Sequence, residues 1–344
     1  SQYHGNAPTH GNIGFVNKGT ITTAGSKNIG WIALDEGGTM DRQHYFHNET
    51  GGTINIGGTN DVLAVIQSPV AAANSGWSYI NDGNINLTGD TQYGIIVDNK
   101  HSYDAAEILL NKPITLSGTS SAGVVFKGWM DLDGGAPFSH STSDNIVTTL
   151  PGSTRISVIR LDLTGDKNTG VYFESTSPNT FTLNEYKINV TGSKNTGVLV
   201  KQGKVNLGSG TEHAINITSG SENMGIYTAA PMTTAADITI TSDKSTGIFA
   251  NNAGAVTNTG KISATGASVK AIVANKSTTI TNSGQVDVTG TAASATDGAV
   301  GFAAMNGGTI THTGGGTITV DGSASIGSYA ERGGTVDITG GTIK

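Results

Sequence analysis

The chain has 344 residues and a formal net charge of −7, and it contains 50 glycines and 48 threonines but only 13 leucines and no cysteine. Scarce leucine and 13% charged residues exclude helical bundles and coiled coils, and the lack of a glycine at every third position excludes collagen. The excess of negative charge argues against nucleic acid as a partner, because nucleic-acid binding rewards clustered lysine and arginine.

Three short blocks recur in the same order from residue 16 onward. The Asn block is an apolar residue followed by an Asn-x-Gly turn, as at residues 16–19 and 280–284. The alternating block is an apolar-polar-apolar run that often ends in Thr-Gly, as at residues 85–89. The glycine block is a glycine followed by apolar residues, as at residues 197–200. Period-two alternation bounded by Gly and Asn predicts short β-strands joined by sharp corners.

The glycine block marks the period of the repeat. Its first slot contains Gly30, Leu63, Gly94, Gly123, Gly170, Gly197, Gly225, Gly247, Ala271, Gly301 and Gly327. These positions cover 297 residues in ten intervals, so one repeat averages about 30 residues. One such unit cannot bury its apolar face alone, whereas stacked units can. We therefore predict an all-β fold: a right-handed parallel β-helix with three strands per coil and about eleven coils, running through residues 1–344 as a single segment.

Other repeat folds fit less well. Leucine-rich repeats need far more leucine, and WD repeats need four strands per unit and a Trp-Asp signature that is absent. A β-sandwich would not place the same residue types in the same slots ten times.

The outward slot of the alternating block is expected to be solvated, because it is polar in every copy. Its residues are Thr22, Asn55, Asn86, Thr115, Asp162, Asn189, Asn216, Thr239, Ser263, Asp287 and Thr319, with Asp337 in a final half copy that begins at Val336.

The middle slot of the glycine block is also expected to point outward, yet it is apolar or aromatic in every copy. Its residues are Ile32, Val65, Ile96, Val125, Tyr172, Leu199, Tyr227, Phe249, Val273, Ala303 and Tyr329. Two interpretations stay open: the chain's own insertions or a second domain cover this ladder, or part of it is an interaction surface. Tyr172, Tyr227 and Phe249 are the candidate binding residues on it.

Insertions break the repeat at about residues 35–46, 98–111 and 127–160, and residues 103–110 have the composition of a short helix. Loops on a rigid scaffold often carry binding groups. The longest insertion supplies the candidate binding residues Trp129, Asp131, Asp133, Phe138 and His140. The aromatic rings would stack on a sugar or fill a partner's pocket, or alternatively cap the apolar ladder. The two carboxylates have the spacing for calcium binding or for acid/base work on a glycoside.

Catalytic motifs are missing. The sequence has no His-Glu-x-x-His, Gly-x-Ser-x-Gly or Walker motif, and the pair His44 and His47 lacks a third ligand nearby. We therefore expect no enzymatic activity, no catalytic residue, no cofactor and no metal site. The Asn residues of the Lys-Asn-x-Gly corners, Asn28, Asn168 and Asn195, predict stacked amide ladders instead.

The ends of the sequence suggest a fragment. The N-terminus lacks the pattern of a signal peptide, no apolar run approaches the length of a membrane-spanning helix, and the C-terminus stops inside the repeat without a polar capping unit. We expect a piece of a longer protein.

The phrase Ile-x-Val-Thr-Gly-x-Lys-Asn-Thr-Gly-Val-x-Val, found at residues 188–200, and the phrase Asn-x-Gly-x-Ile, found at residues 258–262, resemble the passenger domains of classical monomeric autotransporters. The similarity is greatest to the large fusobacterial outer-membrane adhesins. The resemblance implies an extracellular rod on the bacterial surface, attached to the outer membrane only through a C-terminal β-barrel that is not in this chain. It also implies a monomer whose partner is a receptor, protein or glycan, on a host cell or another bacterium. The family has no shared ligand motif from which to assign binding residues.

We accordingly expect an adhesin segment that binds through its loops and one outer face. Two alternatives stay open: a structural stalk of a larger protein, and a polysaccharide-degrading β-helix enzyme, which would require a carboxylate cluster on one face.

Overall fold

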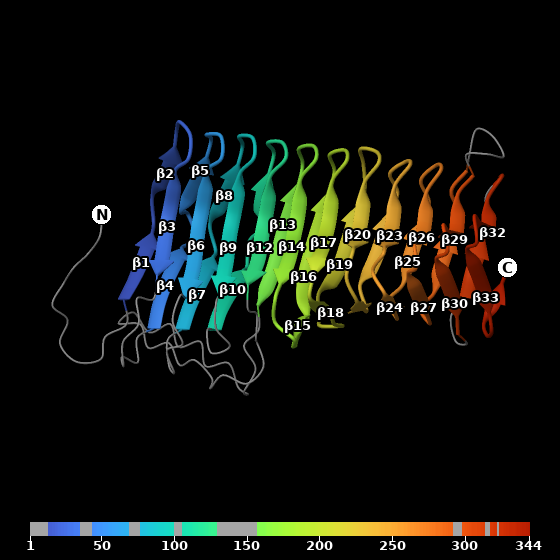
Figure 1. Ribbon diagram of the computed structural model, residues 1–344. Helices are drawn as coiled ribbons and strands as arrows, with labels where there is room; N and C mark the ends of the chain where they lie inside the picture. The colour runs from blue at the N-terminus through green and yellow to red at the C-terminus, as the bar shows by residue number, and fades with distance from the viewer. Residues whose placement is uncertain are drawn as a thin grey trace.

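The computed structural model describes residues 13–34, 43–68, 76–99, 105–128, 157–291, 298–313, 317–321 and 323–344. Within these ranges the chain forms 34 strands and no helix, wound into a rod of stacked coils (Figure 1). Strands of successive coils pair in parallel along the rod. The predicted all-β parallel β-helix is confirmed.

The glycine blocks form an eleven-stranded sheet, which contains one strand for each predicted copy. Its strands are β3 (Ile29–Leu34), β6 (Val62–Ser68), β9 (Tyr93–Asn99), β12 (Ala122–Gly128), β14 (Thr169–Ser175), β17 (Thr196–Gln202), β20 (Met224–Thr228), β23 (Thr246–Asn251), β26 (Lys270–Asn275), β29 (Val300–Met305) and β32 (Ile326–Glu331).

The alternating blocks stack in a second sheet. Its strands are β2 (Thr20–Thr23), β5 (Thr53–Ile56), β8 (Asn84–Leu87), β11 (Ile114–Leu116), β13 (Val158–Leu163), β16 (Glu185–Val190), β19 (His213–Ile217), β22 (Asp237–Ile240), β25 (Ile262–Ala264), β28 (Val286–Val288), β31 (Thr317–Val320) and β34 (Thr342–Ile343).

The Asn-block strands divide into two groups. The first four, β1 (Ile13–Asn17), β4 (Gln43–Asn48), β7 (Gly76–Asn81) and β10 (Ala105–Leu110), join the alternating-block sheet through β13. The others form a separate seven-stranded sheet: β15 (Thr180–Leu183), β18 (Lys204–Leu207), β21 (Met232–Thr234), β24 (Ala255–Asn258), β27 (Thr279–Asn282), β30 (Thr309–His312) and β33 (Thr335–Ile338).

Two predictions about local structure are wrong. Residues 105–110 form strand β10 instead of a helix, because pairing with β7 buries Ile108 and Leu110 and outweighs local helix propensity. The half copy at Val336 belongs to the Asn block, since β33 pairs with β30 and places Asp337 opposite Thr311. Both blocks alternate in the same way, so only the path of the coil distinguishes them.

The insertions are shorter than predicted. Strand β4 already begins at Gln43, and β13 at Val158. Each of four neighbouring strands, β3, β6, β9 and β12, is the last described strand before a segment that lies outside the described residues.

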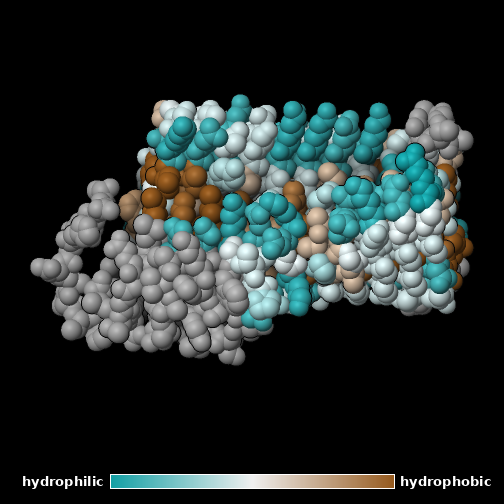
Figure 2. All heavy atoms as spheres, viewed as in Figure 1, coloured by the Kyte–Doolittle hydropathy of each residue, from teal (hydrophilic) through white to brown (hydrophobic). Residues whose placement is uncertain are grey.

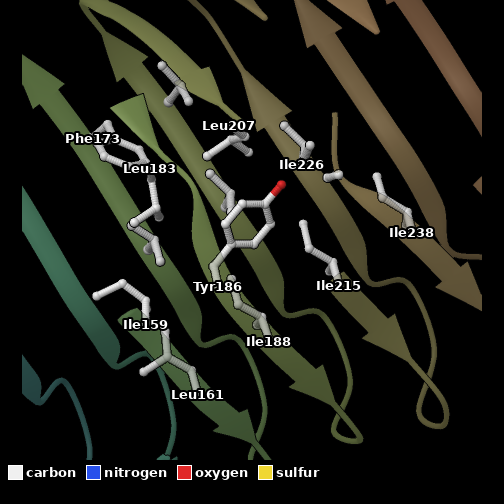
Figure 3. Close-up of a cluster of buried hydrophobic side chains, with 14 of the residues drawn as sticks. Ile159, Leu161, Phe173, Leu183, Tyr186, Ile188, Leu207, Ile215, Ile226 and Ile238 are labelled. Carbon is white, nitrogen blue, oxygen red and sulfur yellow. The ribbon is translucent and has the colours of Figure 1, made fainter. Parts of the chain in front are cut away.

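The core is built from inward columns of branched aliphatic residues (Figure 3). Val171, Val198, Ile226 and Ile248 are paired in register on four successive strands and have no exposed surface. Glycine precedes them because a side chain there would collide with the next coil: a Cβ on Gly197 would lie 2.7 Å from the carbonyl oxygen of Gly225.

Asparagine side chains satisfy the polar corners by two arrangements, and the amide ladder predicted for the Lys-Asn-x-Gly corners lies at the Asn-block corners instead. Asn258 donates from Nδ2 to Oδ1 of Asn282 at 2.6 Å, which is a ladder of side-chain amides. At the other corner the side chain caps the backbone instead: the N–H of Asn168 donates to Oδ1 of Asn195 at 2.7 Å. The residue before each of these caps has positive φ, 59° at Lys194, so the caps hold a left-handed corner.

Candidate functional site

The predicted outward ladder of the glycine blocks exists in full, since its eleven residues are paired in register from Ile32 to Tyr329. The alternating-block face differs, because its outward slot is polar and hydrogen-bonded between coils: Asn216 Nδ2 donates to Asn189 Oδ1 at 3.0 Å. The glycine-block face is therefore the one that departs from an ordinary solvated surface.

Near its C-terminal end two residues of the ladder are covered. Val273 and Ala303 are buried although they lie on the outer face, where they form a small cluster with Val300. The larger side chains of Phe249 and Ile326 pack against this cluster. This part of the ladder supports the interpretation of a covered surface.

Near the N-terminal end the ladder begins at an open position, because Ile32 is 47% exposed. Ile29 and Tyr93, which lie outside the ladder on strands β3 and β9, are 48% and 36% exposed. Figure 2 shows the resulting apolar patch over the first strands of the eleven-stranded sheet. This part supports the interpretation of an interaction surface.

In the middle of the rod, Tyr172, Leu199, Tyr227 and Phe249 lie on consecutive strands β14, β17, β20 and β23, and each is half-buried. We call these four residues the central strip. The rings of Tyr227 and Phe249 are stacked, with centroids 5.8 Å apart and planes 9° apart. Because the two rings cover each other's faces, the strip presents mainly ring edges to the outside.

A charged pair borders one end of the central strip. The Tyr172 hydroxyl donates to Glu174 Oε2 at 2.8 Å, and Lys201 Nζ donates to Glu174 Oε1 at 2.6 Å. The hydrogen bond from Lys201, followed by that from Tyr172, lowers the pKa of Glu174, and the bond to Glu174 raises the pKa of Lys201. Burial, followed by the bond to Glu174, raises the pKa of Tyr172. At neutral pH the pair is fully charged and its net charge is zero.

A row of amides borders the other end. Asn306 Nδ2 donates to Asn275 Oδ1 at 2.7 Å, and Asn275 Nδ2 donates to Asn251 Oδ1 at 3.0 Å. Asn251 Nδ2 then donates to the hydroxyl oxygen of Tyr227 at 3.1 Å. These three asparagines, the amide row, connect three coils to the central strip.

The structure places the predicted site residues unevenly. Tyr172, Tyr227 and Phe249 lie together on the central strip. The loop candidates Trp129, Asp131, Asp133, Phe138 and His140 lie outside the described residues.

Glu174, Lys201 and the amide row were not predicted. A signal for them exists, because the last outward position of a glycine-block strand is polar in several copies, for example Gln67, Asp98 and Glu174.

Catalytic features do not gather on the described faces. His47 is held by Asp82, with Nε2 and Oδ2 2.7 Å apart, and the described residues contain no cluster of three or more His, Cys, Asp or Glu that could bind a metal. Over the same part of the chain, no helix is long and apolar enough to cross a membrane.

The fold is a β-solenoid, and the central strip with its two polar borders is the candidate site on its outer face. No protein-family model, curated protein or solved structure matches the chain.

Proposed function

We propose that this chain is an adhesive segment of a bacterial surface rod, which binds a receptor on a host cell or another bacterium through the central strip and its insertions. The observation that carries the proposal is the contrast between two outer faces of one rod. The alternating-block face is polar throughout, whereas the glycine-block face keeps half-exposed apolar and aromatic side chains beside hydrogen-bonding groups. A pure stalk has no need for this asymmetry.

The resemblance to autotransporter passenger domains supports the extracellular, outer-membrane-attached location that this function requires. A catalytic role has less support, because Glu174, which accepts a hydrogen bond from Tyr172 of the strip, is neutralised by Lys201 at 2.6 Å. We therefore propose a binding role for a monomer, without a cofactor.

The experiment measures attachment of the labelled chain to epithelial cells and to bacterial lawns. The test variant carries Leu199→Thr and Tyr227→Thr, which makes the strip polar and keeps β-forming residues. The matched control carries Asn189→Thr and Asn216→Thr on the alternating-block face, where threonine occupies the same slot in other coils.

We expect the strip variant to lose at least tenfold in attachment and the control to keep it. A third variant, Trp129→Ala with Phe138→Ala, measures the share of the long loop. No attachment of the unmodified chain to any surface would refute the adhesive function and leave the stalk.

A further inference from the structure

We infer that the central strip and the amide row together bind an uncharged linear glycan that lies lengthwise along the rod. This inference rests on the proposed adhesive function and names its ligand class. The repeat of the surface matches such a ligand, because neighbouring coils of a parallel sheet are about 4.8 Å apart. An extended polysaccharide advances by a similar distance per sugar, so equivalent groups on protein and ligand stay in step.

The amide row offers a donor and an acceptor in each coil. Its hydrogen bonds run one way, from Asn306 through Asn275 and Asn251 to Tyr227. In its bonds to the described residues, each amide of the row uses one N–H and each of its carbonyl oxygens uses one lone pair. Asn251 and Asn275 therefore keep a second N–H and a second lone pair for a ligand. Tyr227 accepts at its oxygen and keeps its own O–H to donate. Sugar hydroxyls both donate and accept, which suits this mixed row.

The apolar half of the surface fits the C–H groups of a sugar chain. Leu199, Tyr227 and Phe249 are half-buried, so their side chains are accessible to a ligand while neighbouring side chains restrict their movement. The stacked rings present their edges, so they do not provide the broad face on which one sugar ring stacks tightly. Each coil then contributes a weak contact, and affinity grows with the number of coils that one ligand spans.

Charge selects an uncharged ligand. Glu174 and Lys201 beside the strip neutralise each other at 2.6 Å. The groups of the amide row and the Tyr227 hydroxyl carry no charge, so they suit a neutral ligand. Lys127 is paired with Glu174 on the neighbouring strand, and the heparin comparison below tests whether it favours a polyanion instead.

Peptide binding by strand addition has no support on this face. Strand β17 pairs with β14 on one side and with β20 on the other, and β20 pairs with β17 and β23. The strip therefore offers a peptide no unpaired strand edge, and only side chains are available for recognition.

The test uses isothermal calorimetry with the whole chain and β-1,4-linked oligomers of glucose, N-acetylglucosamine and mannose, each as dimer and hexamer, with a heparin hexasaccharide as the charged comparison. We expect at least one neutral hexamer to bind ten times or more tightly than its dimer. Asn251→Ala with Asn275→Ala should weaken that hexamer at least tenfold, and Tyr227→Phe about threefold.

The matched control is Asn189→Ala with Asn216→Ala, which removes an equivalent amide ladder from the face without an apolar strip and should leave binding unchanged. Thermal melting of every variant shows that the rod is folded, and the Tyr227→Phe variant tests the site without altering the amides.

Several results would overturn the inference: no hexamer binds, dimer and hexamer bind equally, heparin binds best, or the amide-row variant binds like the control. Strip-dependent cell attachment combined with no binding of any hexamer would leave the adhesive function standing and refute the glycan ligand. If the unmodified chain does not attach to cells at all, the adhesive function itself is refuted.

Discussion

Tyr79 on β7 provides a sharp test of the packing inside the rod. Its side chain is fully buried, its ring stacks on Phe46 with centroids 4.8 Å apart and planes 8° apart, and its hydroxyl has no hydrogen-bond partner among the described residues. A buried polar group without a partner costs about 1–3 kcal/mol, so Tyr79→Phe should stabilise this part of the rod by about that amount while the ring keeps its contacts.

Tyr186 is the matched control, because it is equally buried in the same core but donates its hydroxyl to the carbonyl oxygen of Gly208 at 3.3 Å (Figure 3). Tyr186→Phe should therefore destabilise, by about 0.5–1.5 kcal/mol. The two changes are chemically identical and are expected to have opposite signs.

Stacked repeats need not unfold in one step, so local hydrogen exchange of the strands around each site is the appropriate assay, with a thermal melt beside it. Slower exchange in β4 and β7 of Tyr79→Phe, and faster exchange in β16 and β19 of Tyr186→Phe, would support the reasoning. Destabilisation by Tyr79→Phe would show that the hydroxyl has a partner inside the rod and would refute it.

Three further predictions follow from the same core. Burial raises the pKa of the Tyr79 and Tyr186 hydroxyls, so above about pH 10 the folded protein keeps protons that the unfolded chain loses. The free energy of unfolding should therefore fall above about pH 10, by about 1.4 kcal/mol per pH unit for each tyrosine. Denaturation midpoints measured from pH 8 to 11 test this, and a flat profile would contradict it. His312 continues an amide ladder, with its Nδ1 2.9 Å from Nδ2 of Asn282. His312→Asn should therefore be tolerated, whereas His312→Leu should lower the free energy of unfolding by about 1–3 kcal/mol. Equal melting temperatures for the two variants would contradict the ladder. Gly197→Val should lower the free energy of unfolding by about 1–3 kcal/mol or more, because the new side chain would meet the next coil. Gly19→Ala should change the melting temperature little, because nothing lies within 4 Å of its added Cβ. Equal effects of the two variants would argue against the tight stack.

Much of the fold could be predicted because the stack imposes the same demand in every coil. A column such as Val171, Val198 and Ile226 must stay apolar along its whole length, and the glycine before each must stay small. These demands repeat every 30 residues or so and are visible in one sequence. The outward ladder could be placed for the same reason, once the inward columns had fixed the phase of each strand.

The failures arose where two blocks obey the same local rule. Val336 to Ile338 alternates like either block, and only its pairing with β30 assigns it. Residues 105–110 contain good helix formers, and only the pairing of Ile108 with Tyr79 shows that they form a strand.

The polar border of the central strip was missed for a different reason. Glu174 and Lys201 are 27 residues apart in sequence, and the amide row joins residues that are 24 to 31 apart. Such contacts depend on rotamers and on the exact register between coils, which periodicity alone does not provide.

The central claim is that residues about one repeat apart stack directly on the same outer ladder, and the absence of cysteine makes it directly testable. In the double variant Leu199→Cys with Tyr227→Cys, the two positions are paired on adjacent strands, so their Cα atoms should be about 4.8 Å apart, within the range that a disulfide can span. Leu199→Cys with Phe249→Cys places the cysteines two coils apart, beyond that range. Rapid oxidative cross-linking of the first pair with none of the second is the predicted result; no cross-link in the first pair, or equal cross-linking of both, would contradict the stacked rod and the strip built on it.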